Sequence, residues 1–186
     1  MKNITFLGPI AATFSHDAYN ILAERYLAPK TTETNCIPAS SNDEILALIQ
    51  KHGGYGAIAM ETLAGGRVTE PLESFIELLR TYTRTTDCPF HVIGAVRLRL
   101  HFCLMVRPEV SLSAITKVIA HPKALGACKG RIAKMAIPMM NASSNGEAAR
   151  LVALNNEYAD FAALGPKSAS EKYGLKVLDE AFEDQD

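Results

Sequence analysis

Four short segments of this 186-residue sequence combine hydroxyl, acidic, basic or imidazole side chains with glycine and other small residues. They span residues 8–16, 60–68, 120–123 and 141–147. Segments of this kind can hold a carboxylate or a hydroxyl group, because backbone N–H groups at helix N-termini and nearby polar side chains donate hydrogen bonds to it. We therefore expect the four segments to line a small-molecule site.

Several of these residues also have a purely structural interpretation. Thr13 and Ser15 can cap the first helix, since serine and threonine are preferred N-cap residues. Ser144 and Glu147 have the spacing of a capping box. Gly66 can mark a turn that requires positive φ.

Charged side chains in and near these segments are similarly ambiguous. Glu61 follows a predicted buried strand and can be a solvated loop carboxylate. His121 stands before a proline and can be a turn residue. Arg97, Arg99 and His101 alternate along one face of a predicted strand, and such a cationic stripe can attract an acidic substrate. An exposed strand at a hinge would show the same pattern.

Composition excludes several classes of function. The chain is 48% hydrophobic and 21% charged, which permits a buried core, and its net charge of −1 does not favour a nucleic-acid or anionic membrane partner. No apolar run approaches the ~20 residues of a membrane span, and the first residues indicate a strand rather than a signal peptide. The four cysteines are dispersed and no export signal is expected, so we expect a reducing, cytoplasmic location. Because the cysteines have no paired metal-ligand spacing, we expect no bound metal.

The elements that must position these residues alternate between strand and helix, which predicts an α/β fold with parallel sheets. A polar stretch at residues 81–87 is the best candidate for a boundary between lobes. The expected strands are 4–7, 36–37, 57–60, 96–104, 118–120, 161–164 and 175–178. The expected helices are 18–26, 41–52, 71–79, 122–133, 144–152 and 168–173.

The order and spacing of these motifs resemble the catalytic domain of prephenate dehydratases over nearly the whole chain. The resemblance implies an architecture similar to two-lobed, type II periplasmic binding proteins, with the active site in a cleft between lobes. Lobe 1 would comprise residues 1–92 plus 174–186, and lobe 2 residues 93–173. The motifs that carry the resemblance are Gly8-Pro9 with Thr13-Phe14-Ser15-His16, Glu61 with Gly66 and Val68, Phe102-Cys103-Leu104, His121-Pro122, residues 144–149, and Tyr173-Gly174-Leu175.

The same resemblance implies roles for individual residues. Thr13, Glu61 and Thr62 would be catalytic. It also implies a small carboxylate substrate similar to prephenate, a homodimer and no cofactor. The expected substrate-binding residues are Gly8, Pro9, Phe14, Ser15, Gly66, Arg97, His121, Ser144 and Asn145.

The sequence departs from the family pattern in its site motifs. The first turn has one extra residue, and Ala11-Ala12 stand where the second glycine belongs, so we expect a backbone path there that does not use glycine's freedom. The family's Thr-Arg-Phe motif, which carries the key threonine, would follow residues 182–186, where the sequence ends. Four further positions in three motifs differ: Thr62-Leu63 replace Asn-Ser, Phe102 replaces His, and Asn145 replaces Thr.

Three hypotheses remain open from these departures. The first is a lyase that decarboxylates prephenate or a related carboxylate without ordinary dehydration, similar to prephenate decarboxylases of antibiotic biosynthesis. The second is a true prephenate dehydratase of phenylalanine biosynthesis whose sequence stops before the motif. The third is a non-catalytic module that binds a small metabolite in the same cleft.

Overall fold

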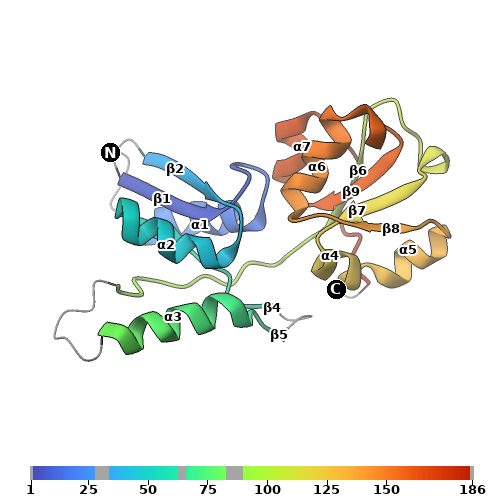
Figure 1. Ribbon diagram of the computed structural model, residues 1–186. Helices are drawn as coiled ribbons and strands as arrows, with labels where there is room; N and C mark the ends of the chain where they lie inside the picture. The colour runs from blue at the N-terminus through green and yellow to red at the C-terminus, as the bar shows by residue number, and fades with distance from the viewer. Residues whose placement is uncertain (1, 28–33, 63–65, 83–89, 185–186) are drawn as a thin grey trace. The chain divides into compact units, whose positions relative to one another are not determined.

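The computed structural model describes residues 2–27, 34–62, 66–82 and 90–184. Contacts within the chain divide it into two compact units (Figure 1). Unit 1 comprises residues 1–8 and 15–98, and unit 2 comprises residues 9–14 and 99–186. The expected boundary at residues 81–87 falls largely outside the described residues, whereas the contacts change units at Leu98.

Unit 1 is built on a parallel three-stranded sheet in the order β2-β1-β3. Ile4, Thr5 and Phe6 are all buried in the central strand, as expected where both faces of a strand are covered. Phe6 stacks on Tyr19 with ring centroids 5.8 Å apart. The elements are β1 (Lys2–Leu7), α1 (Phe14–Tyr26), β2 (Thr34–Ala39), α2 (Asn42–His52), β3 (Tyr55–Ala57) and α3 (Thr69–Tyr82).

The predicted limits of α2 are confirmed. The Oγ atom of Ser41 accepts a hydrogen bond from the backbone N–H of Glu44 at 3.3 Å, which caps the first turn. Gly53 ends the helix with φ +65°. At Gly54, with φ +100°, an added Cβ would lie 2.1 Å from the carbonyl oxygen of Asn3, so the return to the sheet requires glycine.

The strand expected at residues 57–60 is wrong in position. The chain pairs with β1 only as far as Ala57, and Met60 is already exposed. Residues 58–60 are therefore apolar in sequence but do not belong to the sheet. A short antiparallel pair follows, β4 (Glu61–Thr62) with β5 (Gly66–Arg67).

Unit 2 contains a five-stranded mixed sheet in the order β10-β6-β9-β7-β8. Strand β7 is parallel to β8 and β9, whereas β6 is antiparallel to both β9 and β10. Its strands are β6 (Cys103–Val106), β7 (Lys117–Ala120), β8 (Met139–Asn141), β9 (Phe161–Gly165) and β10 (Lys176–Asp179). Its helices are α4 (Pro122–Ala127), α5 (Lys129–Met135), α6 (Asn145–Leu154) and α7 (Lys167–Tyr173), with short 3-10 turns η1 (Leu112–Ala114) and η2 (Asn156–Tyr158).

The core of unit 2 lies on both faces of this sheet. Leu104 and Val106 belong to one buried cluster, whereas Cys103 and Met105 belong to the other, as the period of two along a strand dictates. The first cluster includes residues of α4 and α5, and the second includes residues of α6 and α7. None of the described helices is long and apolar enough to cross a membrane.

Two expected elements of unit 2 differ in the structure. The long strand expected at residues 96–104 is limited to β6, because residues 90–102 form no strand ladder. The helix expected at residues 122–133 is broken at Cys128, where φ is −114°. The second piece, α5, is capped from a distant part of the chain, because the carboxylate of Asp184 accepts the backbone N–H groups of Gly130 and Arg131 at 2.7 and 2.9 Å.

The two units differ from the expected lobes at both ends of the chain. Residues 174–186, expected in lobe 1, belong to unit 2 because β10 pairs with β6 and the N–H of Phe182 donates to the carbonyl of Phe102 at 2.8 Å. Residues 9–14, also expected in lobe 1, belong to unit 2 as well. The α/β fold class is confirmed.

Candidate functional site

Three neighbouring parallel strands of unit 2 end at the same edge of the sheet. Strands β9, β7 and β8 are followed by helices α7, α4 and α6, respectively (Figure 1). Loops that follow the carboxyl ends of parallel strands are the usual ligand-binding position in α/β proteins, because helix N-termini meet there. Three of the predicted site residues, His121, Ser144 and Asn145, lie in these loops or first turns.

His121 and Asn145 tie two of these loops together. The Nδ1 atom of His121 accepts the backbone N–H of Lys123 at 3.2 Å, so His121 caps α4. The backbone N–H of His121 donates to Oδ1 of Asn145 at 3.0 Å. This bond uses the carbonyl end of the Asn145 amide and leaves its NH₂ group as a hydrogen-bond donor.

Ser144 caps α6, as the structural interpretation predicted. Its Oγ accepts the backbone N–H of Glu147 at 3.0 Å, and the residue is 7% exposed. Glu147 does not complete the capping box, because its carboxylate binds both Nε and Nη2 of Arg150 at 2.8 Å. These hydrogen bonds lower the pKa of Glu147. The Ser144 hydroxyl, which accepts from the backbone, still has its own proton to donate.

The loop of residues 9–14 packs directly on the N-terminal turn of α6. A Cβ added at Gly146 would lie 2.6 Å from Cδ of Pro9 and 2.7 Å from the carbonyl oxygen of Ala12. Ala12 itself is fully buried in the core cluster that contains Ala148. The first candidate segment therefore joins the fourth through contacts that only glycine permits at this position of the helix.

The backbone of this loop corrects one expectation. Ala11 has φ +56°, in the left-handed region that glycine adopts readily and other residues adopt at a cost of roughly 1–2 kcal/mol. The chain thus keeps a glycine-like conformation without glycine at this residue. The expected path that avoids this region is wrong, because the packing of Pro9 and Ala12 on α6 determines the path.

Thr13 and Phe14 are the last two residues of this loop. Thr13 is 4% exposed, so its hydroxyl is held among protein atoms. The ring of Phe14 meets that of Phe102 edge to face, with centroids 5.3 Å apart and an interplanar angle of 84°. Phe102 occupies the position where the family pattern has histidine, and it is 8% exposed within the apolar cluster.

The remaining predicted site residues belong to unit 1. The backbone N–H of Gly8 donates to the carbonyl of Ala39 at 2.9 Å at the end of β1. Ser15 lies in the first turn of α1, and Arg97 is exposed on the extended segment that precedes β6. In the antiparallel register of β4 and β5, the backbone of Glu61 lies opposite that of Arg67, and Thr62 lies opposite Gly66. Gly66 has φ +66°, which supports its turn interpretation.

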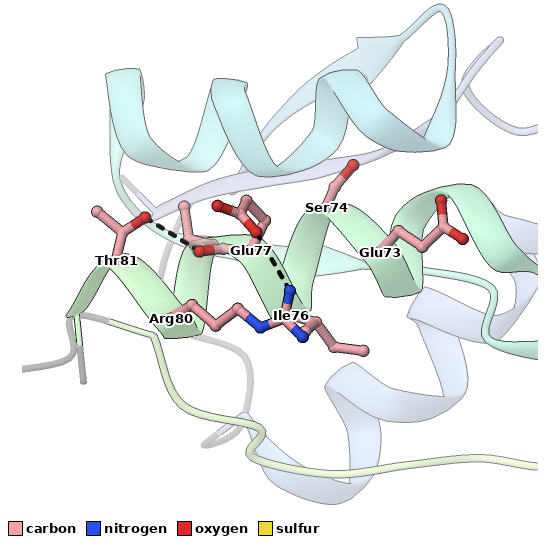
Figure 2. Close-up of a pocket in the computed structure, with 7 residues that line it drawn as sticks. Glu73, Ser74, Ile76, Glu77, Arg80 and Thr81 are labelled. Atoms are coloured by element: carbon pink, nitrogen blue, oxygen red, sulfur yellow. Dashed lines mark hydrogen bonds and ion pairs between the residues drawn. The ribbon is translucent and has the colours of Figure 1, made fainter.

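A surface pocket of about 640 Å³ lies along α3 in unit 1, and none of the predicted site residues lines it (Figure 2). Within it, Arg80 and Glu77 form an exposed ion pair at 3.6 Å, which contributes little to stability. The pocket is lined by Glu73, Ser74, Ile76, Glu77, Leu78, Arg80 and Thr81. Among the described residues, no three His, Cys, Asp or Glu side chains gather as a metal site.

Two residues of the cluster were not named individually as site residues from the sequence, although Gly146 falls within the expected segment 141–147. Gly146 lies in the first turn of α6, where glycine is less favourable than alanine, so its presence is a signal of close backbone approach. Lys172 on α7 donates a hydrogen bond from Nζ to the carbonyl oxygen of Ile10. No pattern in the sequence indicates a contact between residues so far apart.

The chain matches the family model described as prephenate dehydratase over residues 4–186. Arogenate dehydratase 1 of Petunia hybrida is 32% identical over 130 residues, covering 68% of this chain and 30% of the relative. Prephenate dehydratase of Corynebacterium glutamicum is 29% identical over 180 residues, covering 94% of this chain and 52% of the relative. The chain therefore spans about a third to a half of the length of these relatives.

Solved structures show the same fold. The prephenate dehydratase of Arthrobacter aurescens, determined in complex with L-Phe, matches with a TM-score of 0.76 and 23% identity, covering 98% of this chain and 56% of that one. A protein described as GqqA, a novel type of quorum-quenching acylase, matches with a TM-score of 0.75 and 19% identity, covering 98% of this chain and 60% of that one.

Proposed function

This chain belongs to the prephenate dehydratase family, and on that premise we propose that it is a lyase that removes the ring carboxylate of prephenate or of a close relative such as arogenate. The cluster in unit 2 supports this proposal. The N-terminus of α6 supplies backbone N–H donors and a partial positive charge suited to a carboxylate. Ser144 and Asn145 add side-chain donors at the same turn.

Two outcomes are possible once the carboxylate leaves as carbon dioxide. The electron pair of the broken carbon–carbon bond can expel the ring hydroxyl, which must accept a proton from a donor and leave as water, producing an aromatic ring. Alternatively, the pair can be protonated at a ring carbon, and the hydroxyl stays on a non-aromatic ring. The position of the proton donor decides between the two outcomes.

We favour decarboxylation without ordinary dehydration, in a secondary-metabolite pathway such as antibiotic biosynthesis. The observation that carries this proposal is Phe102. Where the family pattern has a histidine, this chain has an apolar ring that is 8% exposed and packed edge to face on Phe14. A phenylalanine cannot donate a proton to a leaving hydroxyl. Thr62, which replaces an asparagine of the family pattern, further changes the polar groups available.

Ordinary dehydration is the second candidate, because relatives such as that of Corynebacterium glutamicum are named as prephenate dehydratases. Incubation with prephenate and with arogenate, followed by ultraviolet absorption and mass spectrometry, distinguishes the reactions. A non-aromatic product that has lost carbon dioxide alone supports our proposal. Phenylpyruvate or phenylalanine would establish dehydration instead. Ligand-induced stabilisation without turnover would indicate a binding module.

We propose Thr13, Glu61 and Thr62 as the catalytic residues. Thr13 is buried in the loop that packs on α6, and in this proposal its hydroxyl donates to the substrate during the reaction. Thr13→Val and Glu61→Gln should each lower turnover by about tenfold or more, the usual scale for a positioned proton donor or acceptor. Unchanged turnover in both variants would discard this assignment.

We further propose a reducing, cytoplasmic location and a homodimer. The location is supported by Cys103 and Cys128, which are free thiols buried in the core. Burial raises the pKa of Cys103 to about 11 and that of Cys128 to about 12, so both thiols stay protonated and unreactive. The homodimer rests on family membership and is tested by sedimentation equilibrium.

A further inference from the structure

We infer that Lys172 is a positioning residue that holds the loop of residues 9–14 in the conformation that presents Thr13 to the substrate. The inference rests on the function proposed above. Lys172 lies on α7 and its Nζ donates to the carbonyl oxygen of Ile10. Both residues belong to unit 2 although 161 residues of chain separate them.

The bond acts at the point of the loop that has the least favourable backbone. The carbonyl of Ile10 belongs to the peptide group that precedes Ala11, whose φ is +56°. Fixing that carbonyl fixes the orientation of the peptide plane and therefore limits rotation about the φ angle of Ala11. Without the bond, relief of the left-handed conformation would favour other loop paths.

The rest of the loop is held by packing on either side of this point. Pro9 and the carbonyl of Ala12 lie against Gly146, and Phe14 packs on Phe102. These contacts fix where the loop begins and ends on unit 2, whereas the Lys172 bond acts on the backbone between them. The position of Thr13 is therefore fixed by the hydrogen bond to the Ile10 carbonyl on one side and by the ring contact of Phe14 on the other.

Lys172 is exposed, so its contribution is local. An exposed side chain that holds the loop through a hydrogen bond adds little to global stability, but it changes the fraction of molecules in which the loop is correctly placed. A ligand that binds only the ordered loop then shows an apparent affinity reduced by that fraction. Loss of Lys172 should consequently raise KM, while kcat changes little once the substrate has bound.

The test compares three variants of the full chain. Lys172→Met removes the donor and keeps the length of the side chain, and Lys172→Arg retains a donor. Lys167→Met is the matched control, because Lys167 lies on the same helix, is exposed, and pairs at 2.8 Å with Glu180 instead of the loop. Amide hydrogen exchange of residues 10–14 and steady-state kinetics with prephenate and arogenate are measured on each.

We expect Lys172→Met to exchange about five- to tenfold faster in the loop, as the loss of one charge-assisted hydrogen bond implies, with a similar rise in KM and less than about twofold change in kcat. Lys172→Arg should recover both values, and Lys167→Met should match the unmodified chain. Unchanged exchange in Lys172→Met would overturn the inference. Faster exchange with unchanged KM would also overturn it, because the loop would then not position substrate.

Failure of the proposed function gives a different result. If the unmodified chain turns over neither prephenate nor arogenate, the proposed lyase activity fails, and with it the role of Lys172 toward that substrate. The exchange rates of residues 10–14 are measured without substrate, so they decide separately whether Lys172 holds the loop.

Discussion

Gly146 on α6 lies against Pro9, so closely that an added Cβ would come within 2.6 Å of the proline Cδ. The same Cβ would lie 2.7 Å from the carbonyl oxygen of Ala12. Real Cβ atoms do not make such contacts, so the loop and the helix can meet in this way only at a glycine. This contact joins the first candidate segment of the sequence to the fourth.

Gly146→Ala should therefore move the loop off the helix. We expect a net loss of about 1–2 kcal/mol in the free energy of unfolding, because overpacking outweighs the better helix propensity of alanine, and a rise in KM. Gly126→Ala is the control, since nothing lies within 4 Å of a Cβ at this helical position. It should stabilise the protein by roughly 0.5–1 kcal/mol. Denaturant unfolding measures both, and changes of the same sign would contradict the prediction.

Ser144→Ala separates capping from ligand binding. Ser144 caps α6 and Ser41 caps α2 in the same manner, each through the backbone N–H three residues later. Both alanine variants should lose about 1 kcal/mol of local stability, as measured by hydrogen exchange in the capped helices. Only Ser144→Ala should also raise KM. Equal KM values in the two variants would show that Ser144 acts only as a helix cap.

Ala11→Gly should stabilise the protein by about 0.5–1 kcal/mol, because glycine adopts the left-handed conformation without strain but loses more chain entropy on folding. Ala136 at the end of α5 has φ +54° and provides a matched control outside the site. Ala136→Gly should give a similar gain in thermal stability without changing KM. A destabilised Ala11→Gly would show that Ala11 is not strained.

Acid should weaken the attachment of the C-terminal segment through Glu183. Burial raises the pKa of this carboxyl. Hydrogen bonds from the backbone N–H of Phe102 at 2.9 Å, from its own backbone and from His101 at 2.8 Å together lower the pKa by more than burial raises it, so the net pKa lies below the ordinary 4.5. A pKa lower in the folded state than in the unfolded state contributes stability above the unfolded value, and this contribution is lost as pH falls through the folded value.

Unfolding by urea at pH 6 and at pH 3 tests this contribution. Glu183→Gln should be less stable than the unmodified chain by about 1–2 kcal/mol at pH 6, because a hydrogen-bonded charge is lost. The difference should shrink at pH 3, because the contribution of the carboxylate is lost as the pH falls towards the lowered pKa of the folded state. An equal difference at both pH values would show that Glu183 does not titrate with folding.

Local patterns predicted those elements whose signals lie within a few residues. Strand and helix alternation predicted the α/β class, and the helices expected to begin at residues 41 and 144 do begin there, each capped by a serine. Such features depend on backbone propensity and on hydrogen bonds between near neighbours, which a sequence displays directly. The resemblance to a known family also came from local motifs, and the family match confirms it.

Only the tertiary structure decided which unit holds each piece of the site. The loop of residues 9–14 follows a strand of unit 1 yet packs on α6 of unit 2, and Ala11 keeps a left-handed conformation without glycine. Likewise, β10 joins β6, and Lys172 reaches Ile10. These relations arise from packing between residues far apart in the chain, where burial and close contact override local preference. The sequence by itself determined the family and the fold class, and long-range packing determined the placement of the loop.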